Sequence, residues 1–571
     1  MTSRRRRTAV LAGVLAGVLV AGAGPVLTPA SADGIPGLDL GSDSEPGWEE
    51  PLEEERQPAV FDDLGPAPEE SPSRVAATGP GASPAGPKVA PLLRRSAWSW
   101  YLDPRVIEDR GRTTFAALAN NGDLQVVQIA NSNARLSRFT IARKVPVDDH
   151  NSPALMRTAS GRYAALWSGH EKTPAYLRVS RNPDSIDQWS PRRQLTGSGL
   201  ENEGASYAVL FRVPQQTDQY VAIVRRKSDR LWVMTTSRDL RRWSKAFPLV
   251  RTIYPIEQRE QPYLKFTFDG TTLHVLGSDR QPGSSGPNKL YHFSIADGVV
   301  RRTDGVVVDT LANIKAGRPI DLRSTSLLYD GAGADGQVRV YDVAVVNGEP
   351  IAAVTSLGGN GTQPAYKWAR FRNGQWQLRT LVRQARYPEG MTLDTADPRN
   401  VYLSYAAPGE RTGRIVHLRT PDDGETWTRH EIGDSPGSRT PTTPVGSGGP
   451  WLAMWLRGPY ESLAKYDTTV TGLTTGRRPV YLTLTWRRTR AGALRAIVLT
   501  RQGYTSVPAE GVPVFLRVVR NGKTRLRPVG TTNRSGKLTV RLDGLRPGAR
   551  VNFVVRPSGA WGAASTKVER L

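Results

Sequence analysis

The stretch ALMRTASGRYAALW, residues 154–167, sets the pattern that decides the fold of this chain. A short apolar segment leads into a turn that contains Gly161, and a second segment of small and aromatic residues ends at Trp167. Short apolar segments bounded by turn residues are typical of β-strands, and glycine suits a tight turn. The stretch therefore predicts two neighbouring strands of an antiparallel sheet.

The same arrangement recurs from Trp98 to about Thr471. Four later copies pair residues 208–211 with 220–224, 263–266 with 273–276, 342–345 with 350–354, and 391–393 with 401–405. A period of roughly 50 residues with four strands per unit is typical of a β-propeller. The units predict seven blades over 96–474. No amphipathic helix of useful length is visible, so the predicted fold class is all-β.

One turn motif supports this prediction. Residues 420–427, TPDDGETW, fit the pattern S/T-x-D-x-G-x-T-W completely. Asp422 is expected to close a hairpin turn by accepting backbone N–H groups, Gly424 to take a positive φ, and Trp427 to pack between blades. Degenerate copies lie at Asp184 and Asp239. These turns resemble the Asp boxes of sialidases and related glycan-active propellers, and we expect them to be structural.

The N-terminus predicts export. Residues 1–32 hold a positive segment at Arg4–Arg7, an apolar stretch and the small-x-small triplet that ends at Ala32, a pattern typical of a secretory signal peptide. A membrane anchor is the alternative, and the export route stays open between Sec and twin-arginine. No later segment reaches the ~18 apolar residues of a spanning helix. Residues 33–95 are rich in Pro, Gly, Ser and acidic residues, which predicts a disordered linker. We expect an extracellular monomer.

Charge and cysteine content restrict the partners. The net charge is +24, and 477–571 alone holds 20 Lys and Arg against three acidic residues, a net of +17. Such a basic module favours polyanions, and outside a cell these are acidic polysaccharides or anionic cell-wall polymers more often than nucleic acid. An Arg-rich proteome is the alternative explanation. The chain has no Cys, which excludes disulfides, thiol nucleophiles and Cys-bound metals.

The same C-terminal region predicts a second all-β module. Its apolar strands lie at 480–484, 512–518, 537–540 and 551–555. The run TTNRSG at 531–536, followed by an alternating strand, resembles an immunoglobulin-like repeat of secreted bacterial proteins. A β-sandwich of this size beside a propeller is expected to act as a spacer or attachment module.

Within the propeller, a paired histidine motif stands out. His150 follows Asp148-Asp149, and His170 lies twenty residues later after Trp167-Ser168-Gly169. Innermost propeller strands begin at the central channel, so both imidazoles are expected to face one pocket. The alternative is that each histidine is bound by neighbouring groups in a turn, as His150 would be by Asp148 or Asp149.

Residues 97–471 resemble the BNR-repeat family that includes the seven-bladed ulvan lyases and related polysaccharide lyases. The resemblance rests on these landmarks: WSWYLDPR at 98–105, DDHNSPAL at 148–155, WSGH at 167–170, QPYLK at 261–265, the segment from Tyr387 to Tyr405, and MWLRG at 454–458 with YD at 466–467. The DDHN and GH pair is the most specific part. The implied reaction is β-elimination from a uronic acid of an acidic polysaccharide.

Such a lyase needs a base, an acid and groups that neutralise the carboxylate. The resemblance implies His150 as the base and Tyr207 as the acid or partner base. It implies His170 and Arg225 as carboxylate-neutralising residues. Arg259 and Tyr387 complete the predicted substrate-binding set. Arg259 enters because the family has an arginine where this chain has Gln261, two residues later.

Other interpretations stay open. The segment Ser278-Asp279-Arg280-Gln281-Pro282 departs from the family pattern, which has a histidine there. A glycoside hydrolase of sialidase-like or rhamnose–glucuronate type is one alternative, with Arg105 in the place of a first sialidase arginine. A non-catalytic glycan- or envelope-binding propeller is another. No cofactor is indicated with certainty; the sequence is compatible with a structural calcium ion and does not identify a metal.

Overall fold

The computed structural model describes residues 86–255, 261–281, 286–332, 336–358, 362–432, 437–446, 448–489, 494–542, 545 and 548–570. This part of the chain is all-β, as predicted, with short helical segments such as α1 (Leu311–Lys315) and the 3₁₀ turn η1 (Asp149–Asn151). No helix within these ranges is both long enough and apolar enough to cross a membrane. The predicted signal peptide, Arg259 and most of the predicted linker lie outside the described residues.

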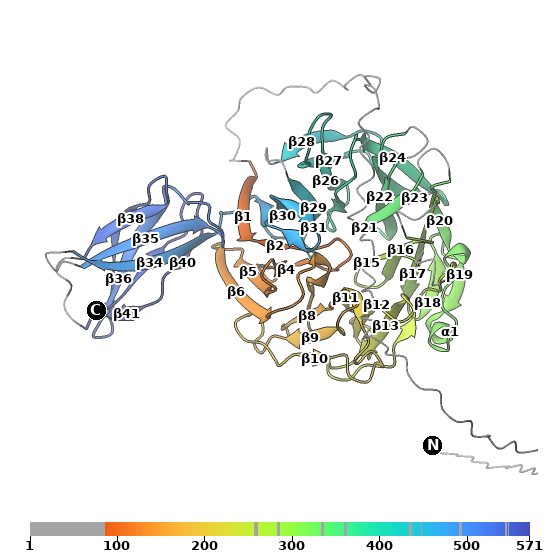
Figure 1. Cartoon of the computed structure of the whole chain (residues 1–571), viewed down its shortest axis with the longest axis horizontal. Coiled ribbons are helices and arrows are strands. Elements are labelled where there is room, and N and C mark those ends of the chain that lie inside the picture. Colours follow the sequence, from red (N-terminus) through yellow and green to blue (C-terminus); the bar gives the residue numbers. More distant parts are fainter. Residues whose placement is uncertain are drawn as a thin grey trace, which may run out of the picture. The chain divides into compact units, whose positions relative to one another are not determined.

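Residues 88–474 form a series of antiparallel sheets, most of four strands in sequence order (Figure 1). They are β2 (Ser96–Ala97), β4 (Arg112–Ala119), β5 (Leu124–Ala130) and β6 (Arg135–Ala142), with β3 (Val106–Asp109) on β4; β7 (Ala154–Arg157), β8 (Tyr163–Trp167), β9 (Tyr176–Val179) and β10 (Arg193–Gln194); β11 (Ala205–Arg212), β12 (Tyr220–Arg226), β13 (Trp232–Ser237) and β14 (Phe247–Pro248); β15 (Leu264–Phe268), β16 (Leu273–Ser278), β17 (Lys289–Ala296), β18 (Val299–Arg302) and β19 (Val307–Thr310), with β20 (Ser326–Asp330) on β17; β21 (Val338–Val346), β22 (Glu349–Ser356), β23 (Ala365–Arg372) and β24 (Gln375–Arg383); and β25 (Met391–Leu393), β26 (Asn400–Tyr405), β27 (Arg414–Arg419) and β28 (Thr428–Ile432).

A further sheet joins the two ends of this region. It has the order β1 (Lys88–Arg94), β33 (Thr469–Thr474), β30 (Trp451–Arg457) and β29 (Ser438–Thr442). Lys88 lies opposite Thr474 and Arg94 opposite Thr469. Residues 88–94, whose composition places them in the linker 33–95, therefore belong to the sheet, because Leu92 and Leu93 are buried there. This pairing ties residues that are almost 400 positions apart in the chain.

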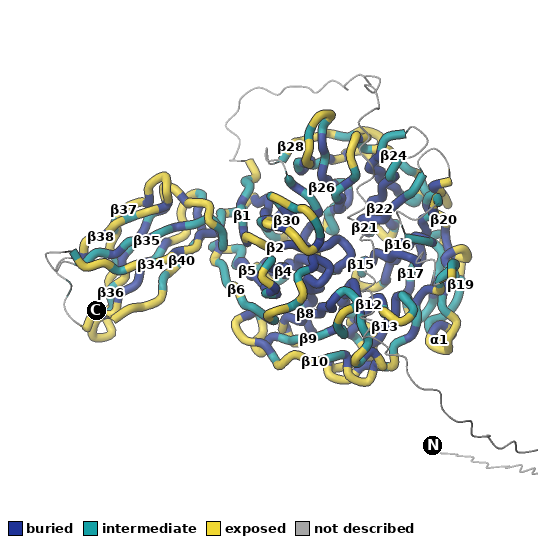
Figure 2. Tube along the Cα trace, viewed as in Figure 1, coloured by how far each residue is buried: buried dark blue, intermediate teal, exposed yellow. Residues whose placement is uncertain are grey.

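Within a sheet, burial decreases from the first strand to the last. Strand β11 is buried along nearly its whole length, whereas β28 is exposed. The first strands also contact one another across sheets, as β7 does with β11, β21 with β25, and β25 with β29. Figure 2 shows the buried residues gathered where these first strands meet and the exposed ones at the rim. The arrangement is propeller-like: apolar strands fill the centre, and polar last strands face water.

From Val480 the chain forms two sheets that share one hydrophobic cluster. One has the order β34 (Val480–Arg488), β35 (Leu494–Gln502) and β38 (Lys537–Arg541); the other has the order β37 (Lys523–Thr531), β36 (Pro513–Arg520), β39 (Arg550–Val555) and β40 (Ala564–Ser565), with β41 (Glu569–Arg570) on β39. Leu482 and Val498 from the first sheet and Leu516 and Phe553 from the second belong to the cluster. The residues that alternate with them along each strand face away from this cluster.

Candidate functional site

The hairpin of β7 and β8 brings His150 and His170 together. Ala154 lies opposite Leu166 in this pair, and each histidine lies four residues beyond that register point, His150 before it and His170 after it. His150 is in η1, just before β7, and His170 is in the turn after β8. The twenty-residue spacing thus places both side chains at the same end of the same sheet.

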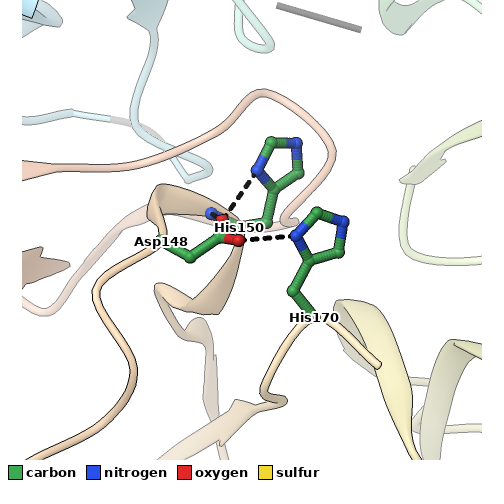
Figure 3. A group of neighbouring side chains, drawn as sticks. All are labelled: Asp148, His150 and His170. Atoms are coloured by element: carbon green, nitrogen blue, oxygen red, sulfur yellow. Dashed lines mark hydrogen bonds and ion pairs between the residues drawn. The ribbon is translucent and has the colours of Figure 1, made fainter. Parts of the chain in front are cut away.

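Asp148 joins the two imidazoles. It is the N-cap of η1, where its Oδ1 accepts a hydrogen bond of 3.0 Å from the backbone N–H of His150. The same oxygen lies 3.0 Å from His150 Nδ1, and its Oδ2 lies 2.6 Å from His170 Nδ1. The rings stack with centroids 4.6 Å apart. In Figure 3 the second nitrogen of each ring points away from Asp148, so two Nε2 atoms are presented together.

The charges of this cluster are strongly coupled. Burial by itself lowers the pKa of His150, but the carboxylates of Asp149 and Asp148 outweigh it and hold that pKa well above its ordinary value. Burial likewise favours the neutral form of Asp148, yet its hydrogen bonds from His150 and His170 hold its pKa well below the ordinary range. At neutral pH we therefore infer an anionic Asp148 and a cationic His150.

A metal ion is a poor fit to this arrangement. Asp148, His150 and His170 each offer one donor atom, and the three atoms lie within 4.8 Å of one another. Donor atoms around a tetrahedral zinc, at ~2.1 Å from the ion, lie roughly 3.4 Å from each other. The 2.6 Å between Asp148 Oδ2 and His170 Nδ1 is instead the length of a charge-assisted hydrogen bond. Calcium prefers oxygen ligands, and this cluster offers nitrogen as well as oxygen. A structural calcium ion elsewhere stays compatible with the sequence.

Tyr207 and Arg225 from the next sheet complete the group. The Tyr207 ring lies 5.3 Å from that of His150 and 5.9 Å from that of His170. The Arg225 guanidinium lies 4.6 Å above the Tyr207 ring, and its Nη2 donates to Glu171 Oε1 at 3.3 Å. Arg225 of β12 is opposite Ser206 of β11, so it lies beside the start of β11, where Tyr207 is found. The structure thus brings His150, His170, Tyr207 and Arg225 together.

The backbone is strained at this site. His170, Glu171 and Tyr207 have φ values of +46°, +68° and +56°, in the left-handed region that non-glycine residues rarely adopt. Tyr207 lies where the register of β11 shifts between Ser206 and Val209, which indicates a β-bulge. Such conformations cost of order 1–3 kcal/mol each and gather at functional sites. The three residues border the same cluster of His150, His170, Tyr207 and Arg225.

Buried aromatic residues outside the predicted site continue this cluster. Tyr101 packs 5.2 Å from Tyr207 and 5.0 Å from Tyr263. Trp100 follows, 5.3 Å from the guanidinium of Arg339. Their signal in the sequence was present, because Trp100 and Tyr263 lie within the landmark motifs. Glu171 and Arg339 had no such signal.

Tyr387 lies in this extended cluster rather than beside the histidines. Its ring is 5.1 Å from the Arg339 guanidinium, and its buried hydroxyl has no hydrogen-bond partner among the described residues. Gln261, which stands where the related motif has arginine, is buried. The predicted substrate-binding set is therefore divided: His170 stacks on His150, Arg225 lies over Tyr207, and Tyr387 lies beside Arg339. Arg259 lies outside the described residues.

Residues 99–384 match the model of the BNR repeat-containing family. This chain belongs to that family. Among curated proteins, none matches the sequence. Among solved structures, an ulvan lyase described as a new family of polysaccharide lyase, bound to -[GlcA(1-4)Rha3S]-, is 12% identical with a TM-score of 0.53, covering 69% of this chain and 96% of that one. A second structure of such an ulvan lyase, also 12% identical, has a TM-score of 0.52 and covers 68% and 96%. At this identity the likeness shows the fold.

In this BNR-repeat chain, the predicted Asp-box residues lie on turns between outer strands. Asp422 Oδ1 accepts from the backbone N–H of Thr426 at 2.7 Å, and Trp427 packs 5.6 Å from Trp368 of the neighbouring sheet. Gly424 has a φ of +100°. Asp239 accepts from two backbone N–H groups, and Asp184 pairs with Arg157. These contacts fold turns and pack sheets.

Arg105 lies in the centre of the molecule, away from the histidines. It is buried in the wall of a cavity of ≈230 Å³ together with Asp103 and Asp342. Other lining residues, Arg157 and Arg212, are the last residues of β7 and β11. The candidate site lies at the opposite ends of these strands. Arg105 is therefore not placed to act as an arginine of a sialidase-like site together with Arg225.

Proposed function

We propose that this chain is a secreted polysaccharide lyase that cleaves a uronic-acid-containing glycan by β-elimination. The observation that carries the proposal is the contact of two stacked imidazoles with Tyr207, over whose ring the Arg225 guanidinium lies. This group combines cationic hydrogen-bond donors with a proton-transfer side chain in a buried, water-poor setting. The likeness in fold to structures of ulvan lyases supports the same reaction class.

The proposed reaction starts with the carboxylate of a uronic acid. The Nε2–H of a cationic His150 would bind it and stabilise the charge that develops on it, with the His170 ring packed alongside. A base then removes the proton at C5. The freed electron pair forms the C4=C5 double bond as the C4–O4 bond breaks, and the departing O4 takes up a proton.

The raised pKa of His150 changes its proposed role. A neutral imidazole is required of a base, whereas the carboxylates of Asp149 and Asp148 outweigh burial and raise the pKa of His150, which favours its cationic form. We therefore assign the carboxylate to His150 and His170, and the proton transfers to Tyr207. Tyr207 would act from its phenolate form, whose oxygen takes the C5 proton, and the cations of Arg225 and His150 beside its ring would offset that negative charge. Tyr207 can then return the proton to O4.

The proposal includes the organisation of the whole chain. We propose that 1–32 is a cleaved signal peptide, 33–85 a linker, the sheets up to Thr474 a closed seven-bladed propeller, and 477–571 an immunoglobulin-like module. The protein would then work outside the cell as a monomer. The net charge of +17 supports attachment of 477–571 to an acidic polysaccharide or cell-wall polymer.

The test is turnover of a panel of uronic-acid glycans, with and without sulfate, read by the absorbance of the unsaturated product. We expect at least one glycan to yield that product, and Tyr207→Phe to abolish it. Reducing ends without unsaturation would instead identify a glycoside hydrolase. Binding of a glycan without any cleavage would identify a non-catalytic propeller.

A further inference from the structure

The C-terminal module carries a basic sheet face. Along β34, β35 and β38 the residues that alternate with the buried cluster face outward. The outward residues are Tyr481, Thr483, Thr485 and Arg487 of β34; Arg495, Ile497, Leu499 and Arg501 of β35; and Lys537, Thr539 and Arg541 of β38. We call this set the outer face. It holds five cationic side chains and no carboxylate.

Three of these arginines form a row across the strands. Arg487 lies directly opposite Arg495, and Arg495 lies directly opposite Arg541. Residues opposite each other in an antiparallel pair have Cβ atoms ~5 Å apart, and like charges in such positions destabilise the sheet. The register thus holds the Cβ atoms of three arginines within about 10 Å along one line across the strands.

In the described part of the module, Arg487, Arg495 and Arg541 form no ion pair with a carboxylate. Among the described residues from 477 onward, an ion pair joins Arg534 and Glu510, with 3.8 Å between Nε and Oε1. The Nε of Arg495 is buried and has no hydrogen-bond partner among the described residues. A planar guanidinium row that lacks counter-charges is complementary to a chain of carboxylate or sulfate groups.

We propose that the outer face binds an anionic polysaccharide through Arg487, Arg495 and Arg541. The choice of a polysaccharide rests on the proposed function, since a propeller that acts on an acidic glycan gains from a second grip on the same polymer. The outward threonines between the cations add hydroxyl groups that suit sugar hydroxyls. The outer face would bind any part of the polymer without cleaving it, whereas the histidine site would bind the uronic acid at which cleavage occurs.

The experiment measures retention of the full chain on immobilised heparin, a sulfated uronic-acid polymer, in a salt gradient. The variant Arg487→Gln/Arg495→Gln/Arg541→Gln should bind roughly 10-fold or more weakly at ~0.1 M salt. A matched control, Arg517→Gln/Arg520→Gln/Arg550→Gln, removes the same charge from the other sheet and should bind as the unmodified chain does.

Equal losses in both variants would mean that net charge alone sets retention, which overturns the proposal. Loss of retention on DNA-cellulose but not on heparin would also overturn it, in favour of a nucleic acid. The measurement is made in a Tyr207→Phe background, so that failure of the proposed lyase reaction does not affect it.

A separate observation concerns the hairpin of β31 (Tyr460–Ser462) and β32 (Lys465–Tyr466). The Tyr460 hydroxyl donates to Asp149 Oδ2 at 2.8 Å, and the Asp149 backbone N–H donates to Leu463 O at 2.9 Å. The other oxygen of Asp149 lies 2.8 Å from His150 Nδ1. A hairpin more than 300 residues away in sequence therefore holds the carboxylate that faces His150.

We propose that Tyr460 is a positioning residue that fixes His150 through Asp149. The guanidinium of Arg439 lies 3.6 Å from the centre of the Tyr460 ring and holds it in place from the far side. Among the described residues, the other titratable groups that face His150 are Asp148, His170 and Tyr207. Loss of that hydroxyl would leave the Asp149 charge to His150 alone.

The test is the titration of His150 by NMR in the absence of any glycan, so it does not depend on the proposed reaction. Tyr460→Phe should raise the titration midpoint of His150 by about 0.5–1 pH unit, the equivalent of one hydrogen bond. Tyr466→Phe is the matched control, because its hydroxyl donates to Leu118 O instead. An unchanged or lowered midpoint in Tyr460→Phe overturns the proposal.

Discussion

The imidazole rings of His150 and His170 stack 4.6 Å apart with their planes at 12°, and one carboxylate, that of Asp148, binds both. This arrangement fixes the direction of both rings, because each Nδ1 is held by a separate oxygen. It also favours a cationic imidazole at His150, because the buried carboxylates of Asp149 and Asp148 raise the pKa of that ring.

Substitution of either site histidine is expected to slow turnover, whereas substitution of an exposed histidine is not. His150→Ala and His170→Ala should each lower the rate of product formation by roughly 10²–10⁴-fold, because the carboxylate of the sugar loses either the His150 donor or the ring that packs against it. His430→Ala, at an exposed position, should leave the rate unchanged. A chelating agent should also leave it unchanged. Inhibition by the chelator that zinc reverses would contradict the hydrogen-bonded interpretation of the cluster.

Stability should depend on pH through His150. Its folded-state pKa is raised above the unfolded value of ~6.5, so its contribution is fully present below ~6.5 and is lost as pH rises through the raised pKa. We expect the melting temperature to fall as the solution becomes alkaline, and His150→Gln to flatten that fall. Parallel melting curves for the two proteins between pH 6 and 9 would show that the coupling is absent.

Tyr207 and Arg225 are expected to act as a unit. Tyr207→Phe keeps the ring but removes the proton-transfer oxygen, so product formation should stop while glycan binding persists. Arg225→Lys loses the planar fork that lies over Tyr207 and pairs with Glu171, which should reduce turnover. Arg226→Lys, which alters the neighbouring Asp229 pair, is the control. Rates in single-turnover assays separate the two effects.

The buried pair of Lys265 and Asp103 is expected to stabilise the centre of the molecule. Lys265 Nζ lies 2.8 Å from Asp103 Oδ2, and burial lowers the pKa of the lysine and raises that of the aspartate. Lys265→Met should cost about 3–5 kcal/mol in the free energy of unfolding, because Asp103 is left buried and unpaired. Lys289→Met, which breaks the half-exposed pair with Asp330, should cost about 0–1 kcal/mol. Denaturant unfolding measures both.

Gly424 is expected to be irreplaceable for packing but not for chemistry. A Cβ there would lie 2.6 Å from the Trp368 ring, whereas at Gly409 it would meet nothing within 4 Å. Both have positive φ. Gly409→Ala should therefore cost about 1 kcal/mol, the backbone strain alone, and Gly424→Ala clearly more. Turnover by the folded protein should be normal in both. Equal losses of stability would show that Trp368 moves aside.

Much of the site could be found from the sequence because its spacing is local. The register of β7 and β8 carries His150 and His170 to one level, and a hairpin register follows from turn length and alternation. The β-content of the repeats and the turn at Asp422 were visible for the same reason. Strand β1 was not, since Lys88–Arg94 becomes a strand only by pairing with β33.

The chain by itself therefore determined the all-β architecture, the family and the histidine pair, because short-range alternation, turns and motif spacing encode them. Tertiary structure alone decided that Asp148 is shared by both rings, that Tyr460 donates to Asp149, and that the pKa of His150 is raised. Those properties depend on groups brought together from distant segments. They also depend on the exclusion of water around them, which strengthens each charge interaction and which no local pattern records.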